Sequence, residues 1–516
     1  MPFYQPSHDV LSSRNATIGA LFHARVPANP SQRAVVEGTR VLNYLELEER
    51  SNRLANALLE LGLARGDRVG LLARNCLEYL EVELAAAKAG LILACLNWRL
   101  GDRELQHCIT LVEPKVVIAQ ADLTPALDRL EFPPHQRITI GAEYESFMAA
   151  ASERYPDLEI DPESGLVILY TSGTTGLPKG ALVSHRAMVA RGMCFTSEFE
   201  VPIGDNFCAW APFYHMASTD QALGTLLRGG TVHVVDGYEP DRLIDVLERE
   251  KMRFFILMPG MVGPFAEILK ARNVQIKGVG ICGAMADLVP REDIAAATLA
   301  LDAPYNNSFG ATETGLPPAS SNLIPIGVAP ANLSKRQSAF CELRLVDPED
   351  NEVPVGTPGE VALRGATLFS GYWNADETNA EDFRNGWFHM GDVLRRNEDG
   401  TLDYVDRVKY MIKSGGENIY PPEIEQVMLA DGRVHEAVVV RRTDRKWSEV
   451  PVAFVVPADT ALTADDLMAL CRENLSSYKR PKDIFFVAEE ELPRSTTGKV
   501  QRHELEARLP STDRQE

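Results

Sequence analysis

The N-terminal two-thirds of the chain alternates short apolar runs with helix-length segments, and this alternation constrains the fold more than any other feature. Residues 44–61 and 79–88 have helical patterns, whereas 68–72 and 115–119 have the apolar character of buried strands. Strands separated by helices form βαβ units, which build parallel sheets with helices on both faces. The pattern therefore predicts an α/β body with two layers of parallel sheet.

The pattern changes twice beyond this body. Between about 340 and 405, apolar and polar residues alternate with turn signals, which predicts antiparallel β structure, either a small β-barrel or a folded sheet. After Arg407 a compact α+β pattern begins, with strands at 437–441 and 452–456 and a helix near 465–475. We predict an N-terminal body of residues 1–408, which includes the β-rich part, and a smaller, mobile C-terminal α+β domain of residues 409–516.

Composition excludes several classes of function. The chain has 516 residues, 45% hydrophobic and 24% charged, with a formal net charge of −21. This acidity argues against a nucleic-acid partner, because phosphate backbones are bound by clustered Lys and Arg. The eight cysteines show no Cys-x-x-Cys pair and no metal-ligand spacing. No apolar run is long enough to cross a bilayer and no secretory signal opens the chain, so we expect a cytoplasmic protein.

Residues 170–180 read Tyr-Thr-Ser-Gly-Thr-Thr-Gly-Leu-Pro-Lys-Gly and directly follow an apolar run. Glycines let a backbone approach an anion closely, while N–H groups, hydroxyls and one lysine donate to its oxygens. The segment is not a Walker A loop, because Lys179 is followed by Gly180 instead of Ser or Thr. It predicts a polyphosphate-binding loop made by Thr171, Ser172, Gly173, Thr174, Thr175, Gly176 and Lys179.

This order of residues resembles the phosphate-loop signature of the adenylate-forming superfamily, which includes acyl-CoA synthetases, aryl-CoA ligases, beetle luciferases and nonribosomal peptide synthetase adenylation domains. Further segments resemble that family's motifs, so the resemblance runs from about 39 to 502 and is most similar to the acyl-CoA ligases. These segments are 212–216 (PFYHM), 281–284 (ICGA), 308–314 (SFGATET), 386–392 (GWFHMGD), 406–419 (DRVKYMIKSGGENI) and 493–499 (PRSTTGK).

The resemblance implies a nucleotide site. Phe309 would pack on adenine, Thr312 would contact the α-phosphate, and Glu313 would help to hold Mg²⁺, a hard cation that prefers carboxylate oxygens. Asp392 and Arg407 would contact the ribose. The remaining nucleotide contacts are expected from Gly283, Ala284, Ser308 and Gly310.

The resemblance also implies the catalytic, acyl and CoA positions. Lys499 would bridge the carboxylate and the α-phosphate, and Lys409 would be the hinge of the C-terminal domain. The expected catalytic residues are Lys499, Thr171, Lys179, His215 and Glu313. The expected acyl pocket consists of His215, Met216, Asp220, Gly283 and Leu316, and the expected CoA contacts are Lys413, Ser414, Gly415 and Gly416.

Two segments depart from the family pattern. Met390 stands where relatives usually have Thr, which removes a hydroxyl near Asp392. Residues 335–340 read Lys-Arg-Gln-Ser-Ala-Phe where relatives usually have a Gly-Arg-Pro turn. The local turn and the nearby acyl tunnel are therefore expected to differ.

The resemblance implies an AMP-forming carboxylate–CoA ligase that uses ATP, Mg²⁺ and coenzyme A and passes through an acyl-adenylate. A medium-chain, aryl, alicyclic or otherwise functionalised acid is expected, because residues 216–221 mix small and polar side chains. Three alternatives stay open: an adenylation enzyme that loads a carrier protein, a luciferase-like oxygenase, and a non-catalytic ligand-binding descendant. A homodimer is an expectation at the level of the family.

Overall fold

The computed structural model describes residues 9, 12–13, 16–131, 136–171, 177–320, 322–414, 417–459, 461–494 and 500–509, and only the backbone at position 418. The chain divides into two compact units. The first comprises residues 1–342 and 364–386, and the second comprises residues 343–363 and 387–516. The domain boundary expected at 408/409 falls inside the second unit and stays a prediction.

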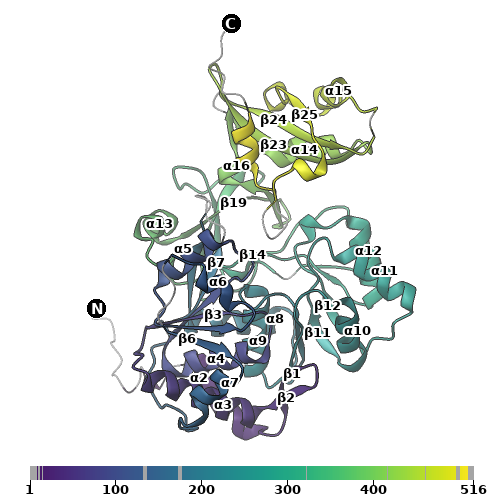
Figure 1. Cartoon of the computed structure of the whole chain (residues 1–516). Helices are drawn as coiled ribbons and strands as arrows, with labels where there is room; N and C mark the ends of the chain where they lie inside the picture. The colour runs from purple at the N-terminus through teal and green to yellow at the C-terminus, as the bar shows by residue number, and fades with distance from the viewer. Residues whose placement is uncertain are drawn as a thin grey trace, which may run out of the picture. The chain divides into compact units, whose positions relative to one another are not determined.

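The largest sheet of the first unit has six strands in the order β6-β5-β3-β4-β7-β8. Neighbours from β6 to β7 are parallel, and β8 returns antiparallel to β7. The chain reverses its direction across the sheet after β4, so right-handed crossovers put α4 and α5 on opposite faces (Figure 1). The strands are β3 (Arg68–Leu72), β4 (Ile92–Leu96), β5 (Val116–Gln120), β6 (Arg137–Ile140), β7 (Gly165–Thr171) and β8 (Lys179–Ser184). The helices are α3 (Tyr44–Glu60), α4 (Leu77–Ala89), α5 (Asp102–Val112), α6 (Thr124–Asp128) and α7 (Ala142–Ala149).

Helix α4 is buried along its whole length, although it carries three glutamates and a lysine. Most of these charges have partners: Arg40 pairs with Glu78, Arg50 with Glu81, and Glu48 with Lys88. Glu83 differs, because both of its carboxylate oxygens are buried without a hydrogen-bond partner among the described residues. A buried helix tolerates charged side chains when each charge is paired, so the unpaired Glu83 is expected to destabilise the folded protein.

Two further sheets complete the first unit. They have the orders β2-β1-β10-β9 and β11-β12-β13-β16, and each is parallel except at one terminal pair. A hairpin of β14 and β15 stands beside them. The strands are β1 (Arg33–Glu37), β2 (Arg40–Asn43), β9 (Phe207–Ala209), β10 (Val232–Val234), β11 (Met252–Phe255), β12 (Val279–Cys282), β13 (Tyr305–Asn306), β14 (Phe309–Ala311), β15 (Gly315–Ala319) and β16 (Leu323–Ile324). The helices are α2 (Ile18–Arg25), α8 (His185–Glu198), α9 (Met216–Leu227), α10 (Pro240–Arg249), α11 (Val262–Arg272), α12 (Arg291–Leu301) and α13 (Asp376–Asp382).

The second unit contains two sheets. The first is antiparallel with the order β17-β18-β19-β20, and among the described residues it stays open, so the expected β-barrel is wrong and the alternative of a folded sheet holds. The second has the order β22-β21-β24-β23 with β25 added parallel to β24. The strands are β17 (Glu342–Val346), β18 (Pro358–Arg364), β19 (Phe388–Arg396), β20 (Leu402–Arg407), β21 (Ile412–Ser414), β22 (Glu417–Ile419), β23 (Val434–Asp444), β24 (Ser448–Pro457) and β25 (Ile484–Phe486). The helices are α14 (Pro421–Leu429), α15 (Ala464–Asn474) and α16 (Arg502–Arg508).

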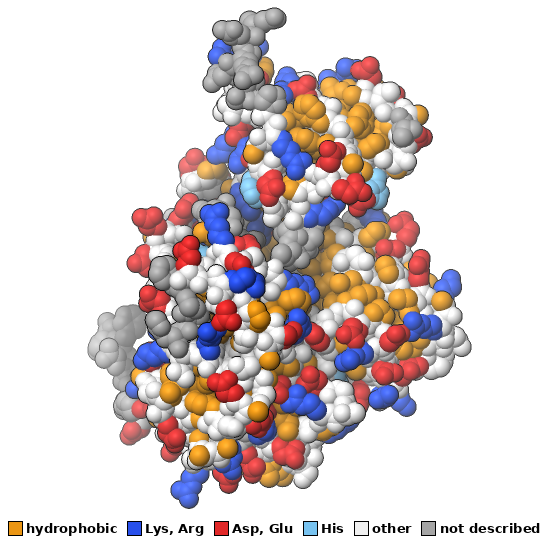
Figure 2. Space-filling view, viewed as in Figure 1, with side chains coloured by type: hydrophobic (Ala, Val, Ile, Leu, Met, Phe, Trp, Pro, Cys, Tyr) orange, Lys and Arg blue, Asp and Glu red, His pale blue; other side chains and the backbone are white. Residues whose placement is uncertain are grey.

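The α/β class and the α+β C-terminal part are confirmed. Strand β3 covers the predicted 68–72, and α3 ends one residue before the predicted 61. Seven of the eight cysteines are buried, and all are free. Acidic and basic side chains are interspersed over the visible face of the protein (Figure 2). None of the helices in the described ranges has the length and apolar character needed to cross a membrane.

Candidate active site

The β7–β8 hairpin carries the predicted phosphate loop. Thr171 ends β7 and pairs with Lys179, the first residue of β8. The residues between these two ends, 172–176, lie outside the described residues, so five of the predicted phosphate contacts stay predictions. The hairpin nevertheless brings Thr171 and Lys179 to the same end of the sheet.

Lys179 and Glu313 both contact Tyr372. The Lys179 Nζ lies 4.8 Å from the centroid of the Tyr372 ring. The Tyr372 hydroxyl donates a hydrogen bond of 2.8 Å to Oε1 of Glu313. The residues expected to contact phosphate and Mg²⁺ are therefore linked through Tyr372, which belongs to none of the recognised motifs.

The turn between β14 and β15 presents the predicted adenine and α-phosphate contacts. Ser308, Phe309, Thr312 and Glu313 are all half-buried, and none is sealed in the core. Gly310 is required here because a Cβ on it would lie 2.1 Å from a backbone oxygen on the opposite strand of the hairpin. The tight hairpin thus holds the aromatic ring, the hydroxyl and the carboxylate on one short segment.

Arg191 on α8 joins this turn to the predicted acyl region. Its Nη2 donates to the carbonyl oxygen of Thr312 at 2.8 Å, and its Nε donates to that of Thr367 at 3.0 Å. Its Nη1 pairs with Oδ2 of Asp220 at 3.2 Å. Arg191 is buried, and α8 also carries Arg186 and Glu198, so no signal in the sequence set Arg191 apart.

The predicted acyl-pocket residues differ in accessibility. His215 is exposed and caps α9 by accepting a 3.1 Å hydrogen bond from the Ala217 N–H at Nδ1, while Met216 and Leu316 are half-buried. Asp220 is 4% exposed and paired with Arg191. Burial raises the pKa of Asp220, and Arg191 offsets this only in part. An adenylation enzyme that loads a carrier protein with an amino acid would need an acidic residue to hold the substrate ammonium group. A carboxylate already paired inside the core is poorly suited to that role, which argues against this alternative.

The backbone at Gly283 is closely approached by a tyrosine ring. Its φ is +77°, and a Cβ on it would lie 2.1 Å from the ring of Tyr305. The Tyr305 hydroxyl also donates to the carbonyl oxygen of Ala284 at 2.9 Å. The close approach that requires glycine is therefore made by Tyr305, which fixes the Gly283–Ala284 backbone.

The departure at residues 335–340 has a structural counterpart. The side chain of Lys335 is fully buried and reaches Asp287 at 2.7 Å and the side-chain oxygen of Asn307 at 2.9 Å. Asn307 immediately precedes Ser308. Lys335 thus supports the turn that carries the predicted adenine contacts, a role not foreseen from the sequence.

In the second unit, the two predicted ribose residues form a pair. Asp392 on β19 and Arg407 on β20 are directly opposite each other in the sheet. Arg407 binds the carboxylate through Nε at 2.9 Å and Nη2 at 3.3 Å. Asp392 is 1% exposed, whereas 41% of the Arg407 side chain is exposed. Their predicted contact with ribose stays a prediction.

The expected hinge and CoA residues lie next to this sheet in sequence. Lys409 is in a short 3₁₀ turn, with its Nζ 4.8 Å from the centroid of the Tyr410 ring. Lys413 is exposed and Ser414 is buried on β21. Gly415, Gly416 and the predicted catalytic Lys499 lie outside the described residues.

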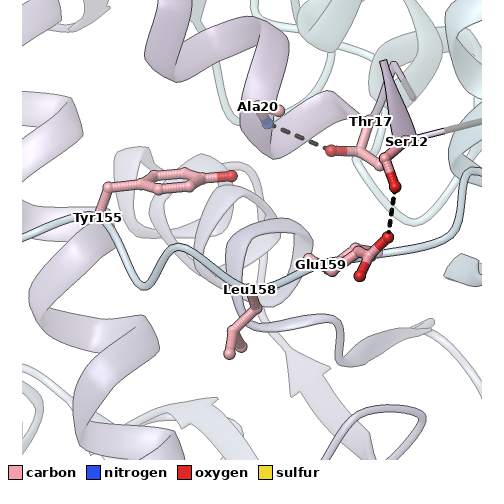
Figure 3. Close-up of a pocket in the computed structure, with 7 residues that line it drawn as sticks. Ser12, Thr17, Ala20, Tyr155, Leu158 and Glu159 are labelled. Carbon is pink, nitrogen blue, oxygen red and sulfur yellow. Dashed lines mark hydrogen bonds between the residues drawn. The ribbon is translucent and has the colours of Figure 1, made fainter. Parts of the chain in front are cut away.

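A separate pocket of about 370 Å³ lies near α2 (Figure 3). Ser12 donates to Glu159 across it at 2.8 Å, and the Thr17 hydroxyl accepts from the Ala20 N–H at its edge. It is lined by Ser12, Thr17, Ala20, Tyr155, Leu158, Glu159 and Ile160. None of these is a predicted site residue, and the lining contains no cation for a phosphate or carboxylate. The chemistry therefore points to the Lys179–Glu313 region instead.

Comparison with known proteins decides the family. Residues 22–373 match the model of the AMP-binding enzyme family, and residues 423–499 match that of the AMP-binding enzyme C-terminal domain. The chain belongs to the AMP-binding enzymes. The predicted resemblance to adenylate-forming enzymes is thereby confirmed.

Several relatives are CoA ligases, and the similarity covers nearly the whole length of both chains. The chain is 32% identical over 502 residues to a feruloyl-CoA synthase from Amycolatopsis sp, covering 96% of this chain and 100% of that protein. It is 31% identical over 494 residues to an indoleacetate–CoA ligase from Aromatoleum aromaticum, covering 92% and 95%. A solved fatty acyl-CoA synthetase from Mycobacterium tuberculosis has a TM-score of 0.78 at 27% identity, covering 95% and 98%. The predicted class, an AMP-forming acyl-CoA synthetase, is confirmed.

Proposed function

We propose that this enzyme joins an aromatic or otherwise functionalised carboxylic acid to coenzyme A in two steps. In the first step the acid attacks the α-phosphorus of ATP, which forms an acyl-adenylate and releases pyrophosphate. In the second step the CoA thiol attacks the acyl carbonyl carbon and AMP leaves. The observation that carries the proposal is that Lys179, at the start of β8, and Glu313 both contact Tyr372.

The chain's own groups would reduce the charge repulsion that opposes the first step. An anionic carboxylate must approach an anionic phosphate, so fixed cations and donors at the phosphates lower the barrier. Lys179 and the Thr171 end of the hairpin supply such groups in the first unit. Lys499 is proposed to bridge the carboxylate and the α-phosphate, after which rotation about Lys409 would withdraw it and expose the acyl-adenylate to CoA.

Glu313 fits a partial Mg²⁺ site. Mg²⁺ is usually held by one or two carboxylates together with substrate phosphates. The described ranges contain no group of three His, Cys, Asp or Glu side chains that would hold a metal without a nucleotide. Glu313 is half-buried on a tight turn and would hold the ion together with the phosphates of ATP. The ion, when bound, would neutralise phosphate charge.

Coenzyme A is proposed to contact the second unit. Basic residues of this unit are candidates for its phosphates, but two of them already have acidic partners: Arg442 lies 2.6 Å from Asp483, and Lys479 lies 2.7 Å from Glu423. Lys446 instead lies over the ring of Trp447, which is 40% exposed at the turn between β23 and β24. An exposed ring beside a cation suits a nucleotide base and its phosphate. We therefore favour Lys446 over the paired residues.

The aromatic substrate class is supported by two features. Both curated relatives described above are named for aromatic acids, ferulate and indoleacetate. The expected acyl-pocket residues include two half-buried apolar side chains, Met216 and Leu316, and the exposed His215, a combination that suits an apolar ring with a polar substituent. The cytoplasmic location and the homodimer stay predictions.

The test is release of AMP and pyrophosphate over a panel of acids, with and without CoA. The panel contains ferulate, indoleacetate, a medium-chain acid, an alicyclic acid and acetate. We expect CoA-dependent turnover to be fastest with an aromatic acid. Lys499→Ala should lose adenylation yet still convert a supplied acyl-adenylate to the thioester, whereas Lys270→Ala, which changes an exposed lysine on α11, should match the wild type. Pyrophosphate release that CoA never accelerates would instead indicate a carrier protein or oxygen as the acceptor.

A further inference from the structure

Tyr372 contacts both charged residues of the proposed phosphate site. Its hydroxyl donates to Oε1 of Glu313 at 2.8 Å, and the Nζ of Lys179 lies 4.8 Å from its ring centroid. A hydrogen bond to one carboxylate oxygen restricts rotation of the carboxylate and leaves the other oxygen directed elsewhere. A ring face beneath an ammonium holds that cation by cation–π attraction. One side chain therefore orients a cation and an anion at once.

Tyr372 is itself held firmly by its surroundings. The side chain of Asn379 accepts from the Tyr372 N–H at 2.7 Å and donates to its carbonyl oxygen at 2.8 Å. The segment around Tyr372 also continues the sheet beside β8, because the Trp373 N–H donates to the Gly180 carbonyl at 2.8 Å and the Leu182 N–H donates to the Gly371 carbonyl at 3.0 Å. The tyrosine backbone thus moves with the strand that carries Lys179.

The same segment is bonded to the Glu313 turn. The Phe369 N–H donates to the Glu313 carbonyl oxygen at 2.9 Å, and the Phe369 ring packs edge-on against the Tyr372 ring at 4.9 Å. Both the backbone and the carboxylate of Glu313 therefore have partners on residues 369–372. These contacts set the spacing between Lys179 and Glu313, two residues far apart in the sequence.

We propose that Tyr372 is a positioning residue for the adenylation step: it fixes the Glu313 carboxylate and the Lys179 ammonium in the relative positions that receive the ATP phosphates and their Mg²⁺. This inference rests on the proposed function. A site that stabilises developing charge works best when its groups are oriented before the reaction, because no reorganisation is then needed. Tyr372 supplies that orientation without being expected to touch the reacting atoms.

The test is Tyr372→Phe, which keeps the ring under Lys179 and removes only the hydroxyl. We expect pyrophosphate formation to slow by about 10- to 100-fold, the range for losing one hydrogen bond to a charged group. Conversion of a supplied acyl-adenylate to the thioester should stay at the wild-type rate. Tyr372→Leu, which also removes the ring, should raise the KM for ATP above that of Tyr372→Phe, because Lys179 then loses its cation–π contact.

A binding measurement provides a readout independent of turnover. Calorimetric titration with a non-hydrolysable α,β-methylene analogue of ATP is made with and without Mg²⁺. In the wild type, Mg²⁺ should increase the affinity for the analogue, and we call this increase the Mg²⁺ gain. In Tyr372→Phe the Mg²⁺ gain should be smaller by at least about threefold, because the Glu313 carboxylate is no longer oriented. If wild-type protein turned over no acid, the proposed function would fail while this titration still tested Tyr372.

Tyr144→Phe is the matched control. Tyr144 also donates from its hydroxyl to a glutamate, Oε2 of Glu81 at 2.9 Å, but within the buried contacts of α7 and α4. We expect this variant to unfold at lower temperature with an unchanged Mg²⁺ gain and unchanged adenylation. The proposal is overturned if Tyr372→Phe keeps the wild-type Mg²⁺ gain and adenylation rate, or if its losses simply follow a fall in unfolding temperature, as a purely structural tyrosine would show.

Discussion

Replacement of Glu83 on α4 by methionine should stabilise the protein. Both carboxylate oxygens of Glu83 are buried without a hydrogen-bond partner among the described residues. Burial raises the pKa of Glu83 well above its usual range, and the nearby Asp220 charge raises it further. An unsatisfied buried polar group costs about 1–3 kcal/mol. Methionine has a similar length and no polar atom, so Glu83→Met should recover roughly that free energy of unfolding.

The effect should grow with pH. Because the folded-state pKa of Glu83 is raised, the folded protein keeps a proton that the unfolded chain releases above its own pKa of about 4.3. The wild type therefore loses stability as pH rises through this window, by up to about 1.4 kcal/mol per pH unit. The advantage of Glu83→Met should be larger at pH 8 than at pH 6.

Glu78 on the same helix is the matched control. Although burial opposes it, the hydrogen bond and charge of Arg40 lower the pKa of Glu78. Its stabilising contribution is therefore present above its unfolded-state pKa and is lost as pH falls through the folded-state pKa. Glu78→Gln should lower the free energy of unfolding by a similar amount at pH 6 and pH 8, in contrast to Glu83→Met.

The assay is thermal unfolding of the full chain at a matched scan rate at pH 6, 7 and 8. With an unfolding entropy of about 2.1 cal/mol/K per residue, 1 kcal/mol corresponds to roughly 1–2 °C for a unit of this size. Removal of the unsatisfied carboxyl alone should raise the midpoint by about 1–4 °C, and the loss of the proton-linked cost should add to this increasingly from pH 6 to pH 8. A lower midpoint at all three pH values would mean that Glu83 has a partner in solution, and the reasoning from its isolation would be refuted.

Three further predictions concern other buried positions. Gly283→Ala should lower the midpoint temperature of unfolding and weaken ATP binding, because the added methyl group displaces the Tyr305 ring. The control is Gly260→Ala, where φ is +79° and the surrounding space is open, so that only about 1 kcal/mol of backbone strain is expected. Thermal unfolding and nucleotide titration measure both effects. Lys88→Met should cost about 3–5 kcal/mol in denaturant unfolding, because it leaves a buried carboxylate without its cation. Burial raises the pKa of Asp406 to about 7, so the wild type should lose stability from about pH 4 to 7, and Asp406→Asn should abolish that slope in unfolding measured against pH.

Much of the fold could be predicted from local patterns. The boundaries of β3 and α3 follow from apolar periodicity and from the Asn43 side chain, which caps α3. The β-rich region was predicted as either a closed barrel or a folded sheet, and it forms an open four-stranded sheet. Alternation along each strand predicts that one face is buried but does not determine whether the first and last strands pair with each other.

The site was predicted unevenly. Glu313 and Lys179 stand in recognisable motifs, whereas Tyr372 and Arg191 do not. The signal for Tyr372 was a Gly-Tyr-Trp turn at 371–373, which is common in loops and carries no chemistry by itself. Asp220 appeared available to a substrate in the sequence, yet Arg191 on a neighbouring helix occupies its carboxylate.

The sequence alone determined the α/β class and the family, because these depend on residue order and on periodicities that act over a few residues. The tertiary structure decided which side chains meet. It brought Tyr372 into contact with both Lys179 and Glu313, paired Arg407 with Asp392, and left Glu83 without a hydrogen-bond partner among the described residues. Such contacts depend on the packing of segments that are distant in the chain, because their hydrogen bonds and ion pairs form only when the sheets and helices pack together.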